Sequence, residues 1–400
     1  MIQLKDICDI YDCPHTTAKD EGKGYPLVRT PNVGKGRLIL NGIHRVSEDV
    51  YNSRNARAIP EEGDLILARE APVGNVSIIM DGQRVCLGQR VVLIKPKREL
   101  VDQHFLTYYL LSAEVQHRLK NHANGAVVAH LNVSDIRNLW VTLPEFEEQV
   151  AIGKILRSID DKIELNRQIN DNLEQQIQIL YREWFIDNPK TEWATIALSE
   201  VATFVSGYSY KGNELVDSSE TAMATIKNFE RNGGFKLDGY KPVSPSSKLK
   251  EEQHAELFDI LVAHTDLTQN AEVIGNAEII LSKNSYSDVI FSMDLVKVVA
   301  KESFPYQFLL ALLLKNPVFK SHCIGYVNGT TVLHMNKRAL PDFKIQIPTC
   351  EDAARMNEIA KSIFTKMSEN LSEIANLTKL RDSLLPKLMS GELKINEIDC

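Results

Sequence analysis

Few residues of this sequence combine the type and the spacing that chemistry at a protein site requires. Cys8, Cys13 and His15 lie close together and could form half of a metal site. A tetrahedral site needs a second pair of ligands, and the other four cysteines follow no CxxC spacing. The sequence therefore predicts no bound metal. The scattered thiols are typical of reduced cysteines in the cytoplasm.

Catalytic motifs are missing as well. The sequence has no GxGxxG after an expected strand, no GxxxxGK[ST] and no HExxH. Asp187-Asn-Pro-Lys190 only partly resembles the [DN]PP[YF] loop of amino-methyltransferases, because it lacks the second proline and the base-stacking aromatic; we interpret it as a helix end. Asp294-Leu-Val-Lys297 is better explained as a strand than as a nuclease site. His130 and His334 are interpreted as structural hydrogen-bond partners, and the chain is predicted to be non-catalytic.

One pattern occurs twice at a constant offset of 204 positions (328−124, 334−130, 348−144). The repeated residues are Asn124-Gly125, His130, Asn132 and Pro144 in the first copy and Asn328-Gly329, His334, Asn336 and Pro348 in the second. The offset continues into later apolar segments, where Ile159 aligns with Ile363 and Leu180 with Leu384. A gapless series of this length indicates the internal duplication of a whole structural unit.

The composition is that of a globular protein with more than one domain. The chain has 400 residues, of which 44% are hydrophobic and 25% charged, and two copies of about 190 residues fit the usual domain size. No apolar run reaches the roughly 20 residues that span a bilayer, and the first residues do not resemble a secretion signal. A cytoplasmic location is expected.

The net charge of −7 is unevenly distributed. Residues 1–144 carry 18 basic and 16 acidic groups, whereas residues 145–189 carry 5 and 10. The first globular part holds 11 arginines, and its counterpart, residues 190–350, holds only Arg231 and Arg338. Two copies with one skeleton and different polar chemistry suggest the same task performed on different targets.

Short β-type runs separated by Gly, Pro and Asn fill both copies. In the first copy these runs are 26–30, 64–68, 75–79 and 90–95, and residues 104–120 have helical spacing. The second copy repeats this order, with 259–263 matching 64–68 and a helix expected over 308–320. Both copies are therefore predicted to be mostly β.

Each copy is followed by a long segment with heptad spacing. The first segment ends at Asn188-Pro189, and the second weakens at Arg381 and meets Pro386. The predicted seam consists of Ile159, Ile163, Asn166, Leu173, Ile177, Leu180, Ile363, Met367, Asn370, Ile374 and Leu377. A stripe of apolar residues along a helix usually indicates burial against an ordinary globular core. These two stripes are too long and narrow for one globule, so we expect the two helices to pack on each other. A seam asparagine in each helix costs stability and can fix register.

Two β-rich units of different polar content, each followed by a long heptad helix, resemble the specificity subunit of type I restriction–modification enzymes. Short phrases agree with this along nearly the whole chain: Asp12-Cys13-Pro14-His15-Thr16-Thr17, Ser158-Ile-Asp-Asp-Lys162, Leu165-Asn-Arg-Gln-Ile169 and Leu384-Leu-Pro-Lys-Leu-Met-Ser-Gly-Glu392. The resemblance implies an internally duplicated α+β fold with target-recognition domains at 1–144 and 190–350. Spacer helices at 145–189 and 351–400, the latter with a C-terminal tail, would pack as an antiparallel coiled coil.

The resemblance also implies a function. Each β-rich domain would read one half of a split site in double-stranded DNA and so direct adenine methylation and restriction by partner subunits. This chain would bind no cofactor itself. S-adenosylmethionine, ATP and Mg would be used by two modification (methyltransferase) subunits and by restriction (translocase/nuclease) subunits. An acidic spacer would stay away from phosphate between the half-sites.

Given this resemblance, polar loop residues are the candidates for DNA contact, because donors and acceptors read base edges and cations bind phosphates. The first unit offers His15, Thr16, Thr17, Lys19, Arg29, Thr30, Asn32, Lys35, Arg37, Arg69, Gln89 and Arg90. Arginine commonly reads guanine through its bidentate fork, so this unit is predicted to meet a half-site that contains G·C.

The second unit offers a different set: Tyr208, Ser209, Tyr210, Lys211, Lys227, Asn228, Arg231, His264, Thr265, Asp266, Gln269 and Asn270. These residues favour amide contacts with adenine and carboxylate contacts with cytosine amino groups. Any one of them can be an ordinary solvated loop residue, so the clusters carry the prediction. Asn124-Gly125 and Asn328-Gly329 are interpreted as tight turns.

Two other functions fit the same sequence. The chain could be a non-enzymatic repeat protein that binds another protein and dimerises through its coiled coil, or a fused restriction–modification enzyme without its catalytic part. Binding of duplex DNA distinguishes the first from our interpretation. The second is distinguished by neighbouring reading frames, which should encode an amino-methyltransferase and a helicase-type nuclease.

Overall fold

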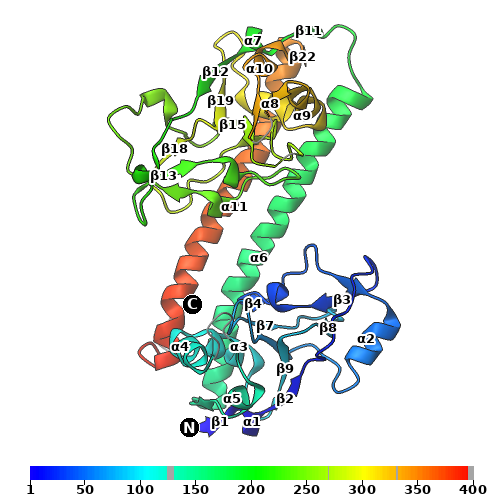
Figure 1. Ribbon diagram of the computed structural model, residues 1–400, viewed down its shortest axis with the longest axis vertical. Coiled ribbons are helices and arrows are strands. Elements are labelled where there is room, and N and C mark those ends of the chain that lie inside the picture. Colours follow the sequence, from blue (N-terminus) through cyan, green and yellow to red (C-terminus); the bar gives the residue numbers. More distant parts are fainter. Residues whose placement is uncertain (124–129, 269, 330–331, 395–400) are drawn as a thin grey trace. The chain divides into compact units, whose positions relative to one another are not determined.

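The structure, a computed structural model, describes residues 1–123, 130–268, 270–329 and 332–394. The chain divides into two compact units: unit 1 contains Met1–Ile163 and Asn376–Cys400, and unit 2 contains Glu164–Ala375. Each unit holds one β-rich part and a portion of each of two long helices (Figure 1). The predicted α+β class with internal duplication is confirmed. The predicted turn at Asn124-Gly125 lies outside the described residues.

Unit 1 is built on a mixed sheet of five strands. Their order is β2 (Cys8–Asp12), β9 (Val91–Pro96), β6 (Leu65–Ala68), β7 (Val76–Ile78) and β4 (Gly36–Arg37). A second sheet has the order β5 (Arg45–Val46), β3 (Tyr25–Val28) and β8 (Cys86–Leu87), and β1 (Ile2–Gln3) pairs with β10 (Trp140–Val141). All residues of β6 are buried, which agrees with its continuous run of apolar side chains.

The helices of unit 1 lie around these sheets. They are α1 (Leu4–Ile7), α2 (Glu48–Arg54), α3 (Gln103–Leu111), α4 (Ala113–His122) and α5 (Val133–Arg137), with the 3₁₀ turn η1 (Thr30–Asn32). Helix α3 contacts strands β7 and β4. Asp102 caps α3 by accepting a hydrogen bond from the Phe105 amide at 2.8 Å. The single helix predicted over 104–120 is wrong, because Ser112 takes an extended backbone and separates α3 from α4. Its hydroxyl donates to the Tyr109 carbonyl instead.

Unit 2 repeats the plan with one further small sheet among the described residues. The main sheet has the order β12 (Ala202–Ser206), β19 (Leu295–Ala300), β15 (Ile260–Ala263) and β17 (Ala277–Ile279). The others are β14 (Lys241–Pro242), β13 (Thr221–Ala224) and β18 (Asp288–Phe291); β16 (Thr265–Asp266), β21 (Leu333–Met335) and β20 (Val327–Asn328); and the pair β11 (Ala194–Ala197) and β22 (Lys344–Ile347).

The helices of unit 2 are short. They are α7 (Leu198–Val201), α8 (Gln307–Leu314), α9 (Pro317–Ile324) and α10 (Ala339–Asp342), with 3₁₀ turns η3 (Gly212–Glu214), η4 (Ile226–Asn228), η5 (Leu237–Gly239) and η6 (Glu251–Gln253). The single helix predicted over 308–320 is also wrong. Pro317 cannot donate to a continued helix, and Asn316 caps α9 by accepting from the Val318 and Phe319 amides.

The duplication extends to the pairing register. Leu65 of β6 pairs with Ile94 of β9, and their counterparts Ile260 and Val298 pair in β15 and β19. Because a register slip of one residue would turn every side chain to the other face, equal register places equivalent residues on equivalent faces. The two sequences therefore build the same backbone frame.

Two long helices follow the β-rich parts, as predicted. Helix α6 (Phe146–Arg182) continues into the π-helical turn η2 (Glu183–Asp187), and α11 (Cys350–Ser390) contains Pro386 near its end. Within unit 1, Ile152 and Leu156 of α6 share a core with Leu388 of α11. Within unit 2, Ile177 shares a core with residues of α11 such as Met356 and Ile363.

Asparagines pair the helices inside unit 2. The Asn370 side-chain amide donates to Asn170 Oδ1 at 2.8 Å, and Asn170 Nδ2 donates to the Met367 carbonyl at 3.1 Å. Asn166 donates to a Glu373 carboxylate oxygen at 2.8 Å. Later residues of α6 thus contact earlier residues of α11, so the two segments run antiparallel. Asn166 and Asn370, which the duplication aligns, have different partners.

The structure places the predicted seam residues on the packed side of both helices. Seven are buried: Ile159, Ile163, Asn166, Ile177, Ile363, Met367 and Asn370. Leu173, Leu180, Ile374 and Leu377 are partly buried. Among the described residues, no helix is long and apolar enough to cross a membrane.

Candidate nucleic-acid interface

A polar cluster occupies the end of strand β6 in unit 1, with Arg69 at its centre. The Arg69 guanidinium donates from Nε to the Leu131 carbonyl at 2.8 Å and from Nη1 to Asp12 at 2.8 Å. Its Nη2 lies 2.7 Å from Nε2 of His130. The Arg69 side chain is only 8% exposed. The guanidinium is therefore held from three sides by β2 and by the segment that follows residue 129.

These contacts determine which ring nitrogen of His130 carries the proton. A guanidinium only donates, so Nε2 of His130 must accept and carry no proton. The imidazole proton then lies on Nδ1, which is 2.6 Å from a Glu70 carboxylate oxygen. The recurring histidine of unit 1 thus connects a buried cation to a carboxylate, and its predicted structural role agrees with these contacts.

Glu70 in turn holds an exposed arginine. Arg90 Nε lies 2.9 Å from the second Glu70 oxygen, while the Arg90 side chain is 62% exposed. The backbone of Arg90 has φ +65°, a left-handed conformation that costs energy for any residue except glycine. A hydrogen bond from the Arg69 amide to the Arg90 carbonyl, at 2.9 Å, holds this backbone in place.

A pocket opens beside this cluster. It has a volume of about 300 Å³ and is lined by His15, Arg69, Glu70, Gln89, Arg90 and His130. The Gln89 amide donates to the His15 carbonyl and accepts from the Thr17 hydroxyl. Five of the predicted DNA-contact residues of unit 1, His15, Thr17, Arg69, Gln89 and Arg90, are therefore brought together from segments far apart in the sequence.

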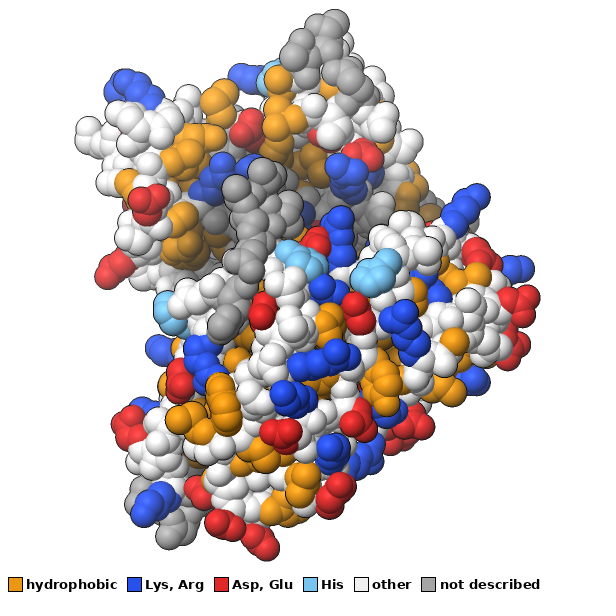
Figure 2. All heavy atoms as spheres, turned by 60° about the horizontal axis from the view of Figure 1, so that its bottom comes forward, with side chains coloured by type: hydrophobic (Ala, Val, Ile, Leu, Met, Phe, Trp, Pro, Cys, Tyr) orange, Lys and Arg blue, Asp and Glu red, His pale blue; other side chains and the backbone are white. Residues whose placement is uncertain are grey.

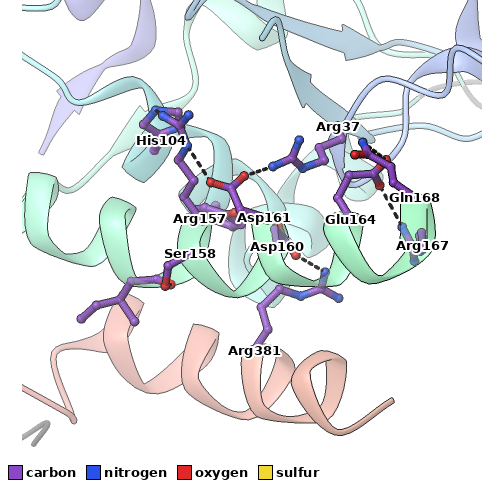
Figure 3. A network of polar contacts seen from close by, with 12 residues as sticks. Arg37, His104, Arg157, Ser158, Asp160, Asp161, Glu164, Arg167, Gln168 and Arg381 are labelled. Atoms are coloured by element: carbon purple, nitrogen blue, oxygen red, sulfur yellow. Dashed lines mark hydrogen bonds and ion pairs between the residues drawn. The ribbon is translucent and has the colours of Figure 1, made fainter. Parts of the chain in front are cut away.

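Other candidates of unit 1 have roles inside the fold. Asn32 is buried, accepts from the Arg29 amide and donates to the Ile39 carbonyl. The Thr16 carbonyl accepts from Arg54, and Thr30 belongs to η1. Arg37 pairs with Asp161 of α6, as Figure 3 shows. Thr16 and Lys19 remain exposed in the first loop, and Lys35 is exposed after η1.

Several candidates of unit 2 are buried in the same manner. Tyr208 is 3% exposed and its hydroxyl bonds Glu214 and Ser246. Asn228 is fully buried and repeats the role of Asn32, since it accepts from the Thr225 amide and donates to the Lys236 carbonyl.

The loop after β15 is folded inward as well. Thr265 and Asp266 are buried, and Asp266 accepts from the amides of Thr268 and Val273. Burial lowers the pKa of the half-buried His264, and electrostatic repulsion from His334 and Lys337 lowers it further. Tyr210 is half-buried, and the exposed candidates of unit 2 are Ser209, Lys211, Lys227, Arg231 and Asn270. Gln269 lies outside the described residues.

Sequence reasoning missed Asp12, Glu70 and Asp294. Asp294 is the counterpart of Arg90, since both precede the equivalent strands β19 and β9 by one residue. The repeat offset of 204 gives this pairing directly (294−90). The interpretation of residues 294–297 as a strand hid it. Asp12 begins a phrase that carries the family resemblance, but no sequence signal gives Asp12 or Glu70 a role in the cluster, because their partners come from distant segments.

The surface charge is mixed. On the face shown in Figure 2, blue Lys and Arg side chains lie among red Asp and Glu side chains, with pale blue His side chains between them. A uniformly basic surface would attract phosphates without regard to sequence. Alternating charge favours contacts made by individual, positioned residues. Among the residues that the structure describes, no group of three or more His, Cys, Asp or Glu side chains could hold a metal ion.

The fold and the clusters define a class of protein: a duplicated α+β chain whose two units share a backbone frame and present different polar side chains. Residues 1–175 match the family model described as the type I restriction modification DNA specificity domain. The chain is 24% identical to the type I restriction enzyme MjaIX specificity subunit of Methanocaldococcus jannaschii, over 99% of this chain and 94% of that one. It is 25% identical to the HindI specificity subunit of Haemophilus influenzae, over 84% and 88%.

The fold agrees with these relatives. The crystal structure of the type I restriction–modification S subunit from M. genitalium superposes with a TM-score of 0.57 at 17% identity, covering 97% of this chain and 95% of that one. This chain is similar to type I restriction–modification specificity subunits over nearly its whole length, and the family model matches its residues 1–175. These relatives are named as specificity subunits, which agrees with the prediction that this chain is a non-catalytic specificity subunit.

Proposed function

We propose that this chain reads a bipartite site in double-stranded DNA, one half through each β-rich part, and thereby directs adenine methylation and restriction by its partners. The observation that carries this proposal is the repeated frame with different side chains. The amide of Arg69 donates to the carbonyl of Arg90, and the amide of His264 donates to that of Asp294. One scaffold that presents arginine in one copy and aspartate in the other is suited to two different half-sites.

The chemistry would belong to the partners. The chain would assemble with two modification subunits that use S-adenosylmethionine and with restriction subunits that use ATP and Mg. Its own residues would supply position, since phosphate contacts fix orientation while base contacts specify sequence. The regions that would read DNA are 1–144 and 190–350, and the helices at 145–189 and 351–400 would fix the distance between them.

A domain exchange tests this proposal. Residues 190–350 are replaced by the equivalent region of a relative, and the full-length chain, with a cognate modification subunit, is used to select bound sites from a randomised DNA library. One half of the selected site should change while the other half stays intact. A matched exchange of residues 1–144 should alter the opposite half. Changes in both halves, or no sequence preference in the unmodified protein, would refute a bipartite reader.

The same selection separates the alternative function. A repeat protein that binds another protein would enrich no DNA sequence with or without the modification subunit. Turnover of labelled S-adenosylmethionine by the rigorously purified chain alone would contradict the division of labour proposed here.

A further inference from the structure

We propose that Arg90 and Asp294 occupy one equivalent base-reading position in the two units, and that their opposite charges set the base preferred there. This inference rests on the proposed function and names the residues that make the choice. In unit 1 the reader would be the Arg90 fork, which matches the two acceptors of guanine. In unit 2 it would be the Asp294 carboxylate, which matches the amino group of cytosine.

Backbone contacts show that the two positions are equivalent. The carbonyl of each residue accepts from the first residue after the matching strand, Arg69 in unit 1 at 2.9 Å and His264 in unit 2 at 2.8 Å. The carbonyls of Arg69 and His264 then accept from the amides of Leu131 and Met335, at 3.0 and 2.9 Å. These bonds place Arg90 and Asp294 at the same point of the same frame.

The surroundings of Arg90 are organised to present it. Its Nε contacts the Glu70 carboxylate, and Glu70 in turn contacts His130. His130 contacts the Arg69 guanidinium, which pairs with Asp12. No contact of the Arg90 terminal nitrogens occurs among the residues that the structure describes, so both terminal NH₂ groups remain available on a side chain that is 62% exposed. A strained φ of +65° aims this residue beside the pocket of about 300 Å³. Strain maintained by surrounding contacts is a common feature of functional positions.

Two neutral hydroxyl groups contact the Asp294 carboxylate directly. One carboxylate oxygen accepts from the Thr265 hydroxyl at 3.0 Å and the other from the Ser292 hydroxyl at 3.3 Å. Each oxygen has a further lone pair that can accept from a base amino group. Thr265 stands where unit 1 has Glu70, and this exchange removes the carboxylate that would repel Asp294. The supporting residue has changed together with the reader.

Library selection with the full-length chain and its modification subunit tests this inference. Arg90→Lys keeps the positive charge and loses the fork, so it should reduce the preference at one base pair of one half-site by about 10-fold to 100-fold. Asp294→Asn should alter one position of the other half-site only. Arg57→Lys, at an exposed arginine of unit 1 outside the cluster, is the matched control and should leave the selected site unchanged.

Glu70 acts through Arg90, and a double variant shows this. Glu70→Gln should weaken the preference at the same base pair as Arg90→Lys, and the two together should do no more than Arg90→Lys alone. If Glu70 had only a structural role, Glu70→Gln would add to the loss of base preference caused by Arg90→Lys and would lower the unfolding temperature of the protein. An unmodified protein that selects no site overturns the proposed function and this inference with it. A defined wild-type site that Arg90→Lys leaves unaltered, or binding weakened equally on all sequences, overturns this inference alone.

Discussion

Arg381 of α11 and Asp160 of α6 form an ion pair inside unit 1, with Nη1 of the arginine 2.7 Å from a carboxylate oxygen of the aspartate (Figure 3). The other Asp160 oxygen accepts from the Tyr108 hydroxyl at 2.7 Å. Asp160 is 8% exposed at its side chain. Burial and the neighbouring carboxylate raise the pKa of Tyr108, so its hydroxyl stays protonated and donates. One carboxylate thus joins both helices to α3.

Removal of the arginine should destabilise unit 1 strongly. Arg381→Met leaves the buried Asp160 carboxylate without its cation, and we expect a loss of roughly 3 kcal/mol in the free energy of unfolding. Adding Asp160→Asn should recover part of this loss, because the uncompensated charge disappears. Asp382→Asn is the control, since Asp382 is 60% exposed and its pairing with Arg381 is screened by solvent. Urea denaturation of the four proteins gives the comparison, and equal stabilities would contradict the role assigned to the pair.

The paired asparagines Asn170 and Asn370 of unit 2 should show strong coupling. Asn370→Leu removes the donor to the half-buried Asn170 and leaves that acceptor unsatisfied, which should cost about 1 kcal/mol. The double variant Asn170→Leu/Asn370→Leu should be more stable than either single variant, because both amides are gone. Without these polar residues the helices of the double variant should also lose their unique register, and sedimentation would then detect a mixture of association states. Additive single effects in denaturation would show that the two amides act independently.

His104 should make unit 1 less stable in mild acid. Arg157 Nη1 lies 2.7 Å from His104 Nε2, which must therefore accept (Figure 3). Burial, followed by the charge of Arg157, lowers the pKa of His104. The neutral form is the one the fold prefers, so this stabilisation is present above the ordinary histidine pKa and declines as the pH falls below about 6.5.

Substitution by an uncharged acceptor isolates this effect. His104→Gln should reduce the decline in unfolding free energy between pH 7.5 and pH 5.5 by an amount on the order of 1 kcal/mol or less, since the group is only half-buried. His117→Gln, at an exposed histidine, should leave the decline unchanged. An identical pH profile for wild type and His104→Gln would show that His104 does not contribute.

The sequence predicted the elements that repeat and missed those made by tertiary contacts. The offset of 204 identified the duplication, and heptad spacing predicted α6 and α11. The breaks at Ser112 and Asn316 were missed because apolar spacing continues across each of them.

The residues of the candidate site were likewise only partly predictable from the sequence. Loop position alone could not separate Asn32 and Asn228, which bond their own backbone, from Gln89 and Arg90, which line a pocket. Burial of a polar side chain depends on which distant strand closes over it. The phrase Ser158-Ile-Asp-Asp-Lys162, quoted above for its family resemblance, contains Asp160 and Asp161, which contact Arg381 and Arg37. Part of that resemblance thus reflects helix packing within unit 1.

The helices should act as the ruler between half-sites. Recognition regions must reach major grooves on the same face of the duplex, and faces recur about every 34 Å. Deleting residues 164–170 of α6 together with 370–376 of α11 removes seven residues from each of two antiparallel segments. This keeps the heptad phase and shortens the pair by about 10 Å, or roughly three base pairs. Site selection from a library with randomised gap length should then yield a shorter gap, with both half-sites unchanged. The control deletes residues 164–170 alone, which mismatches the helices and should abolish binding to any bipartite site. If the paired deletion selects the wild-type gap, the helices do not set the distance.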